Sequence, residues 1–183
     1  MTTLRISPMS RTARREALIE WMSRPEYTHA VTWAPHRESL TLDQLRRLLG
    51  AFCCEVDKFM LGVREVHRRQ SWERLDLIAM PEKLEVNPHL HCVANFSRTH
   101  WQHRLDKPWE HELPRIWRAV TRGSGECKID LNNDRAVAEY ISKEAMRSDH
   151  EYFLSQDFHP DRRIADPMLK DALKLIAPER KAA

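Results

Sequence analysis

The stretch NPHLHCVANF, residues 87–96, places two histidines on either side of a leucine inside an apolar run. Successive side chains of a β-strand point to opposite faces, so His89 and His91 share one face while Leu90 and Cys92 lie on the other. The Asn-Pro pair in front of the run predicts a turn. The stretch therefore predicts a central strand that presents two imidazoles side by side.

The segments around this strand show the two periodicities of regular structure. Residues 27–33 (YTHAVTW) are rich in β-branched and aromatic side chains and predict a strand that ends before Pro35. Apolar residues recur every three or four positions between Leu42 and Phe59, which predicts a helix with Thr41 as its N-cap. The other expected elements are helices at 14–22, 132–146 and 167–177, helical pieces interrupted by Pro108 and Pro114, and strands at 60–68 and 123–131.

Length and composition limit the class of protein. The chain has 183 residues, 42% of them apolar and 31% charged, which is typical of one soluble globular domain. No apolar run approaches the roughly 20 residues that cross a bilayer, and the N-terminus is too charged for a secretory signal, so we expect a cytoplasmic protein without a membrane partner. Four cysteines without a CxxC pair argue against a zinc ribbon or a disulfide framework. The formal net charge of +3 is compatible with nucleic acid but does not establish it.

The histidine pair is a candidate metal site. Neutral imidazoles bind divalent metal ions, but two ligands rarely suffice, and a carboxylate from a neighbouring strand is the usual complement. Glu65 is the first candidate, because antiparallel pairing of the strand expected at 60–68 would bring its side chain close to the imidazoles. Glu82 and Glu85 are nearer in sequence but fall in an expected loop, and the sequence does not decide among the three. The alternative is a pair of ordinary core or surface histidines.

A second group of candidate residues lies in AVAEYISKEA, residues 136–145. Tyr140 and Lys143 are three positions apart and share one face of the expected helix, with the small Ala136 one turn earlier. A tyrosine hydroxyl has a pKa of about 10 and is a poor nucleophile unless a cation stabilises the phenolate or polarises its target. Lys143 and a nearby metal ion could supply both effects. The alternative is a packed aromatic ring next to a solvated charge.

Three segments in this order resemble the motifs of the single-tyrosine HUH endonucleases, which initiate rolling-circle replication of plasmids, bacteriophages and single-stranded DNA viruses. HAVTW (29–33) resembles the first motif, PHLHCVANF (88–96) the histidine motif and YISK (140–143) the tyrosine motif. The resemblance covers about residues 27–147. It implies an α+β fold with a central antiparallel sheet of about five strands, flanked by helices, with the tyrosine helix packed across the histidines. Residues 1–183 would then form one HUH domain with helical extensions at both ends and no helicase domain.

The resemblance also implies a reaction, the metal-dependent nicking and joining of single-stranded DNA. His89, His91 and Glu65 would hold Mg²⁺ or Mn²⁺. Tyr140 would attack the scissile phosphate, which leaves a phosphotyrosine link to the 5′ end and a free 3′ hydroxyl, while Lys143 would orient the substrate or steady the developing charge. The implied partners are single-stranded DNA or an origin hairpin and a separate host helicase, with the protein a monomer or weak dimer in a bacterial cell.

Other readings stay open at this point. The position four residues after Tyr140 is Glu144, so a second tyrosine on this helix is not expected. Relaxase-type and transposase-type HUH enzymes are an alternative, and in a relaxase Tyr27 would be the nucleophile. A non-catalytic single-stranded nucleic-acid-binding module on the same fold and a phosphoesterase that activates water are two more. Trp33 and Trp72 are expected to be exposed and could stack on bases.

Overall fold

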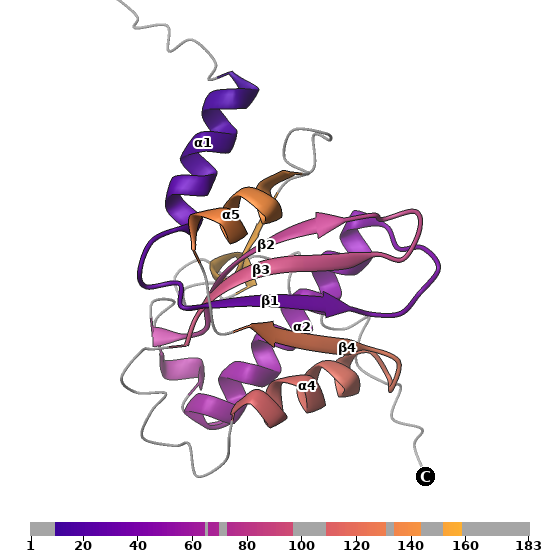
Figure 1. The fold of residues 1–183 in the computed structure, drawn as a ribbon. Helices are drawn as coiled ribbons and strands as arrows, with labels where there is room; N and C mark the ends of the chain where they lie inside the picture. The colour runs from indigo at the N-terminus through magenta and orange to yellow at the C-terminus, as the bar shows by residue number, and fades with distance from the viewer. Residues whose placement is uncertain are drawn as a thin grey trace, which may run out of the picture.

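The computed structural model describes residues 10–64, 66–69, 73–96, 109–130, 134–143 and 152–158. They form a five-stranded antiparallel sheet with helices on both faces, which confirms the expected α+β fold (Figure 1). The strand order is β4-β1-β3-β2-β5. The strands are β1 (His29–Ala34), β2 (Asp76–Glu82), β3 (His89–Asn95), β4 (Glu126–Asp130) and β5 (Phe153–Leu154).

Strand β3 lies in the middle of the sheet, between β1 and β2. The register places His91 opposite Thr32 of β1 and Met80 of β2, and it places His89 opposite Glu82 of β2. Residues directly opposite in an antiparallel pair point to the same face. Thr32, Glu82 and both histidines therefore share one face of the sheet, as the alternation in the sequence predicts for the histidine pair.

The opposite face of the sheet is covered by α2 (Leu42–Leu61) and α4 (Trp109–Val120). Helix α2 begins at the predicted N-cap, where Thr41 and Gln44 form a capping box with each other's backbone N–H groups. Its apolar stripe packs on the inward side chains of the sheet and forms the larger hydrophobic core.

An aromatic cluster fills the centre of this core. The ring centroid of Trp33 lies 4.8 Å from that of Phe52 and 6.0 Å from that of Trp117, and all three side chains are fully buried. The expectation that Trp33 is exposed for base stacking is wrong, because position 33 of β1 points inward. Trp72, the other stacking candidate, lies outside the described residues.

The face that carries the histidines is covered by α1 (Arg11–Met22) and the short helix α5 (Arg135–Ile141), which lie side by side in Figure 1. Helix α5 begins at Asp134, whose side chain accepts a hydrogen bond from the Val137 backbone N–H. The smaller core under these helices holds Leu18, Ile19, Met22, Tyr27, Ile78, Met80, Val93, Ala138 and Ile141. Helix α1 thus supports the helix that carries Tyr140.

Two expected elements differ from the structure. The strand expected at 60–68 does not form, because the helical period of α2 continues through Leu61 and the helix ends at Gly62 with φ 89°. The segment Val66–Arg68 is a short 3-10 helix. Pro114 lies inside α4 instead of interrupting it, since a proline in the second turn removes a single backbone hydrogen bond. Pro108 and the helix expected at 167–177 lie outside the described residues.

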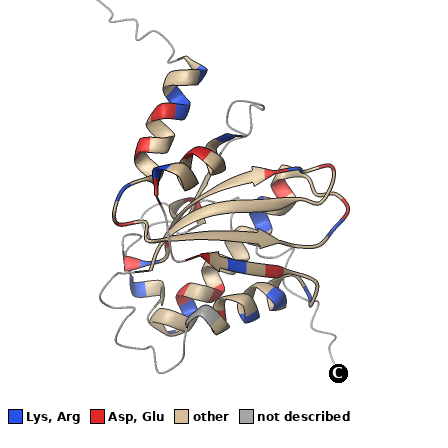
Figure 2. Ribbon diagram, viewed as in Figure 1, with Lys and Arg blue, Asp and Glu red and all other residues tan. Residues whose placement is uncertain are grey.

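Charged residues are distributed unevenly over these elements. Figure 2 shows acidic and basic residues interspersed along α1, whereas β1 and β3 carry none. No helix within the described ranges is long and apolar enough to cross a membrane. The charged groups nearest the histidines are Glu82, the last residue of β2, and Lys143, which follows α5.

A buried carboxyl group on α2 gives the fold a pH-dependent stability. Asp57 is fully buried, and its Oδ1 accepts a hydrogen bond from the Leu75 backbone N–H at 2.8 Å. Burial raises the pKa of Asp57 to about 7, although the Leu75 N–H and Arg74 act in the opposite direction. An acid whose pKa is raised on folding binds its proton more tightly in the folded state, so its contribution to stability falls as the pH rises from about 4 to about 7.

Asp57→Asn is expected to remove this dependence, because an amide oxygen can still accept the Leu75 hydrogen bond but carries no titrating proton. The free energy of unfolding of the variant, relative to wild type, should rise by up to about 1.4 kcal/mol per pH unit between about pH 4 and 7. Urea unfolding of both proteins across this range measures the difference. Parallel pH profiles would contradict the assignment, and Asp130→Asn, at an exposed position on β4, is the control.

Candidate metal centre

Three side chains converge on the histidine face of the sheet. Glu82 is the last residue of β2, and His89 and His91 lie on β3. Glu82 Oε2 is 3.0 Å from His91 Nε2 and 3.5 Å from His89 Nε2, and the potential ligand atoms all lie within 4.8 Å of one another. One carboxylate and two imidazoles in this arrangement could hold a divalent metal ion.

Both imidazoles are oriented by hydrogen bonds on their other ring nitrogen. His89 Nδ1 lies 2.9 Å from the Asn87 carbonyl oxygen, and His91 Nδ1 lies 3.1 Å from Thr32 Oγ1. Asn87 has φ 56°, a left-handed conformation that asparagine tolerates, in the loop between β2 and β3. When the Nδ1–H groups donate to these oxygens, both Nε2 lone pairs face Glu82, which is the tautomer that a metal ion requires.

The electrostatics of the cluster favour the protonation states that bind metal. Burial, together with the neighbouring His89, lowers the pKa of His91 to about 4, which outweighs the opposite effect of Glu82. Burial acts to raise the pKa of Glu82, but Lys143 and the two imidazoles together lower it below the ordinary value. Near neutral pH, the cluster is therefore an ionised carboxylate facing a neutral imidazole.

Two buried atoms of the cluster lack a hydrogen-bond partner among the described residues. These are Glu82 Oε2 and His91 Nε2, which lie close together but without the directional geometry of a hydrogen bond; Glu82 Oε2 is also ion-paired with Lys143 Nζ at 3.2 Å. Glu82 is only 4% exposed, so water does not readily compensate this carboxylate. A cation between the three donors would satisfy both atoms, and one carboxylate oxygen with two imidazole nitrogens is a donor set that can bind a divalent metal ion.

The carboxylate beside the histidines is Glu82, one of the three candidates from the sequence. Glu65, our first candidate, lies outside the described residues, and the strand on which we expected it does not form. The loop expected at Pro81 is also wrong, because β2 continues through Pro81 to Glu82. Among the described residues, β5 pairs only with positions 78 and 79 of β2, so no described strand pairs with this edge at Pro81, and the edge tolerates a residue without an N–H. Glu85 is exposed in the loop.

Tyr140 and Lys143 lie beside this cluster. The ring centroids of Tyr140 and His91 are 5.3 Å apart in an edge-on arrangement, and Tyr140 is 54% exposed. Lys143 Nζ is 3.9 Å from the centroid of the Tyr140 ring and 3.2 Å from Glu82 Oε2. The structure therefore brings the two residues of the YISK segment to the histidine pair, and their catalytic roles stay predictions.

The other tyrosines considered are placed differently. Tyr27 is buried, its hydroxyl donates a hydrogen bond to Asp76 Oδ1 at 3.4 Å, and burial raises its pKa. These surroundings argue against Tyr27 as a relaxase-type nucleophile, because its hydroxyl is shielded and its ionisation is disfavoured. Tyr152 packs edge-on against Trp21, with 6.0 Å between ring centroids.

Thr32 is a site residue that the sequence reasoning missed. Its position in HAVTW was visible, but its contact with His91 depends on the register between β1 and β3, which pairs positions 59 residues apart. The sequence predicts Asn87 only as a turn residue. Its carbonyl contact with His89 depends on the conformation of the loop between β2 and β3, which the sequence pattern does not give.

Thr32→Val is expected to weaken Mn²⁺ binding by about tenfold or more, because it keeps the shape of the side chain and removes the hydrogen bond that orients His91. Isothermal titration calorimetry with Mn²⁺ measures the effect. Thr28→Val is a matched control, since Thr28 Oγ1 contacts the Nδ1 atom of His29 outside the cluster. Equal Mn²⁺ affinities of wild type and Thr32→Val would contradict the proposed role of Thr32.

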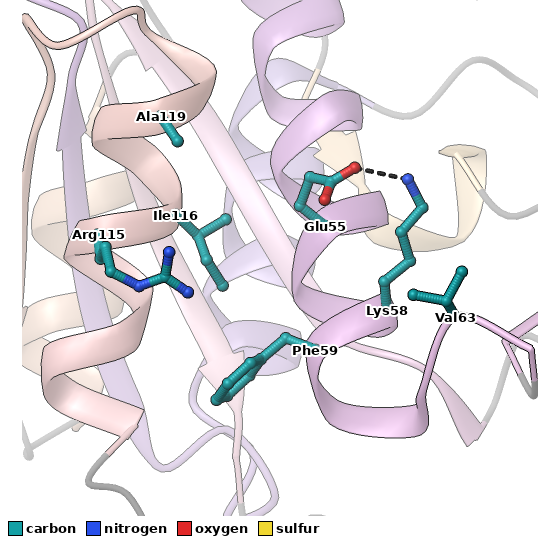
Figure 3. A pocket seen from close by; sticks show the side chains of 7 residues that line it. All are labelled: Glu55, Lys58, Phe59, Val63, Arg115, Ile116 and Ala119. Carbon is teal, nitrogen blue, oxygen red and sulfur yellow. Dashed lines mark hydrogen bonds and ion pairs between the residues drawn. The ribbon is translucent and has the colours of Figure 1, made fainter.

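A cavity of about 260 Å³ lies on the other face of the sheet, between α2 and α4 (Figure 3). Its walls combine apolar side chains with Glu55 and Lys58, which are paired with each other at 2.5 Å, and with Arg115, which is paired with Glu112. The sheet separates this cavity from the histidines. Its lining residues are Glu55, Lys58, Phe59, Val63, Arg115, Ile116 and Ala119, and they form no cluster of potential metal ligands.

Comparison of the chain with models of protein families, with curated protein sequences and with solved structures finds no match. The resemblance to HUH endonucleases therefore rests on the three sequence motifs. Membership of that family stays a prediction.

Proposed function

We propose that this protein nicks and rejoins single-stranded DNA with Tyr140 as the nucleophile, beside a divalent metal ion. The observation that supports this proposal most strongly is the contact between Tyr140 and His91, at 5.3 Å between ring centroids. It places a half-exposed phenol next to a largely buried set of one carboxylate and two imidazoles. Phosphoryl transfer to a tyrosine needs a reachable hydroxyl and a means of offsetting charge on the phosphate, and this arrangement offers both.

Glu82, His89 and His91 are the residues that would hold the ion, either Mn²⁺ or Mg²⁺. When bound, such an ion polarises a phosphoryl oxygen and offsets the negative charge that develops on the phosphate. The protein itself orients the two imidazole ligands, because Thr32 Oγ1 and the Asn87 carbonyl contact their Nδ1 atoms.

In this proposal Tyr140 is the nucleophile of the covalent step. Its Oη attacks the phosphorus atom, a new P–O bond forms to the tyrosine, and the P–O3′ bond breaks. The phenol proton passes to water, and the departing 3′ oxygen takes up a proton from water and leaves as a hydroxyl. The 5′ phosphate stays on Tyr140, so attack by a 3′ hydroxyl on this link reverses the reaction and rejoins the strand.

Lys143 is placed to bind the phosphate next to the nucleophile. Its ammonium lies over the Tyr140 ring at 3.9 Å, and its side chain is 28% exposed, so a strand that approaches Tyr140 meets this charge. Burial alone would lower the pKa of Lys143, but the Tyr140 hydroxyl and Glu82 raise it, so the group stays an ammonium near neutral pH. A charged ammonium can pair with a non-bridging phosphate oxygen and hold it for in-line attack.

The proposed biological role is the initiation of rolling-circle replication of a plasmid, a phage or a related mobile element. Support comes from the order of the HAVTW, PHLHCVANF and YISK segments, which resembles that of replication initiators. A free 3′ hydroxyl is also the primer that a DNA polymerase needs, while unwinding would fall to a separate host helicase.

The test is incubation with Mn²⁺ and a pool of single-stranded oligonucleotides that includes the replicon's own strand, followed by denaturing electrophoresis. We expect cleaved strands with the protein covalently attached, and no cleavage when EDTA removes the metal ion. Cleavage without attached protein would instead indicate a phosphoesterase that activates water. Binding without cleavage would indicate a single-stranded nucleic-acid-binding module.

A further inference from the structure

One oxygen atom in the cluster is shared between two kinds of partner. Glu82 Oε2 lies 3.0 Å from His91 Nε2 and also 3.2 Å from Lys143 Nζ. Because it lies next to the imidazoles, this oxygen is a potential metal ligand. The Lys143 ammonium is its ion-pair partner within the protein. Because Glu82 is almost fully buried, its negative charge needs such a neighbour whenever no metal ion is present.

A metal ion and the Lys143 ammonium cannot both keep their best contact with this oxygen. A divalent ion bound to Glu82 Oε2 would place its double positive charge next to the positive charge of the Lys143 ammonium. The partly buried surroundings screen this repulsion less than water does. The His91 imidazole does not relieve the repulsion, because it is an uncharged ligand near neutral pH. Lys143 is the partner that can leave, since it has a flexible four-carbon stem and a partly exposed side chain.

The surroundings of Lys143 also show what would receive the displaced charge. Its ammonium already lies over the ring of Tyr140, which is the most exposed of the residues in the site. A phosphate group next to Tyr140 would be the nearest new anion. The ammonium therefore has one anionic partner inside the protein and a second in the proposed substrate.

We infer that Lys143 is a built-in counter-cation of Glu82 that a divalent metal ion displaces, so that metal and DNA phosphate bind cooperatively through this one side chain. The inference rests on the proposed function for the identity of the phosphate. Metal binding releases the ammonium toward the strand, and the strand, by taking the ammonium from Glu82, raises the affinity for metal. Thermodynamic linkage requires the two effects to be equal.

Lys143→Met tests the inference, because it keeps the length of the side chain and removes the charge. The probe is Mn²⁺ alone, titrated calorimetrically into the 183-residue protein at neutral pH. Lys143→Met should bind Mn²⁺ more tightly than wild type, on the order of tenfold, since the competing cation is gone. Lys143→Arg retains a charge and should stay closer to wild type. Lys128→Met, which removes an exposed charge on β4, controls for the change in net charge.

The cooperativity is measured by repeating the titration with a short single-stranded oligonucleotide, using Tyr140→Phe proteins to prevent cleavage. The oligonucleotide should tighten Mn²⁺ binding when Lys143 is present, and much less in the Lys143→Met protein. Wild-type Mn²⁺ binding that Lys143→Met leaves unchanged or weakens would overturn the inference without touching the proposed metal site. Absence of Mn²⁺ binding in wild type and all variants would overturn the metal site itself, and the inference with it.

Discussion

Tyr140→Phe is expected to lower the rate of strand cleavage by about a thousandfold or more, because the variant loses the only atom proposed to form the covalent bond. The phenylalanine ring retains the edge-on packing against His91, so the fold and the metal cluster should stay intact. Single-turnover cleavage of a 5′-labelled oligonucleotide in Mn²⁺ measures the rate.

Two controls separate loss of the nucleophile from damage to the protein. Tyr140→Phe should bind Mn²⁺ with wild-type affinity, which excludes an effect on the cluster. Tyr152→Phe removes the hydroxyl of another exposed tyrosine, one that packs on Trp21, and should cleave at the wild-type rate. Full activity of Tyr140→Phe would contradict the assignment of the nucleophile and favour attack by water.

Glu82→Gln is expected to weaken Mn²⁺ binding by at least about a hundredfold, a larger loss than that expected for the supporting residue Thr32. The amide is nearly the same size as the carboxylate but carries no charge, so the described cluster keeps only its two imidazoles as strong ligands. Calorimetric titration measures the affinity. Wild type should also show a rise in Tm with added Mn²⁺ that the variant lacks, because an ion that binds only the folded state stabilises it.

The same experiment distinguishes the three carboxylates that the sequence left open. Glu85→Gln changes an exposed loop residue three positions away and should keep wild-type affinity. Glu65→Gln tests the ligand first expected from the sequence, and it too should keep wild-type affinity if Glu82 completes the site. A loss of Mn²⁺ binding in Glu65→Gln with none in Glu82→Gln would contradict the site described above.

Local patterns were sufficient for several parts of the fold and the site. Alternation in PHLHCVANF predicted that His89 and His91 share a face, and the helical period with Thr41 in front of it predicted α2 and its cap. The spacing of Tyr140 and Lys143 predicted that they share one face of a helix. Helix α5 ends at Ile141, before Lys143, but Tyr140 still contacts His91 and Lys143 still contacts Glu82. Each of these features depends on residues a few positions apart.

The features that sequence reasoning missed depend on contacts between distant segments. Glu82 was assigned to a loop because Pro81 precedes it, and β2 tolerates this proline where the two-residue strand β5 does not reach. Thr32 reaches His91 only through the register between β1 and β3. The strand expected around Glu65 does not form for a different reason. The helical spacing of apolar residues in α2 continues to Leu61, and the apolar-polar alternation after it is too weak to define a strand.

The most direct test of the account is to locate the DNA on the protein after cleavage in Mn²⁺. Trypsin cuts after Arg135 and Lys143, which releases the peptide AVAEYISK with Tyr140 as its single tyrosine. After nuclease trimming, mass spectrometry should find this peptide with a nucleotide attached through phosphate, and it should find no such peptide when EDTA is present or when Glu82 is replaced by glutamine. Cleavage with the nucleotide on another residue, or on none, would contradict the account.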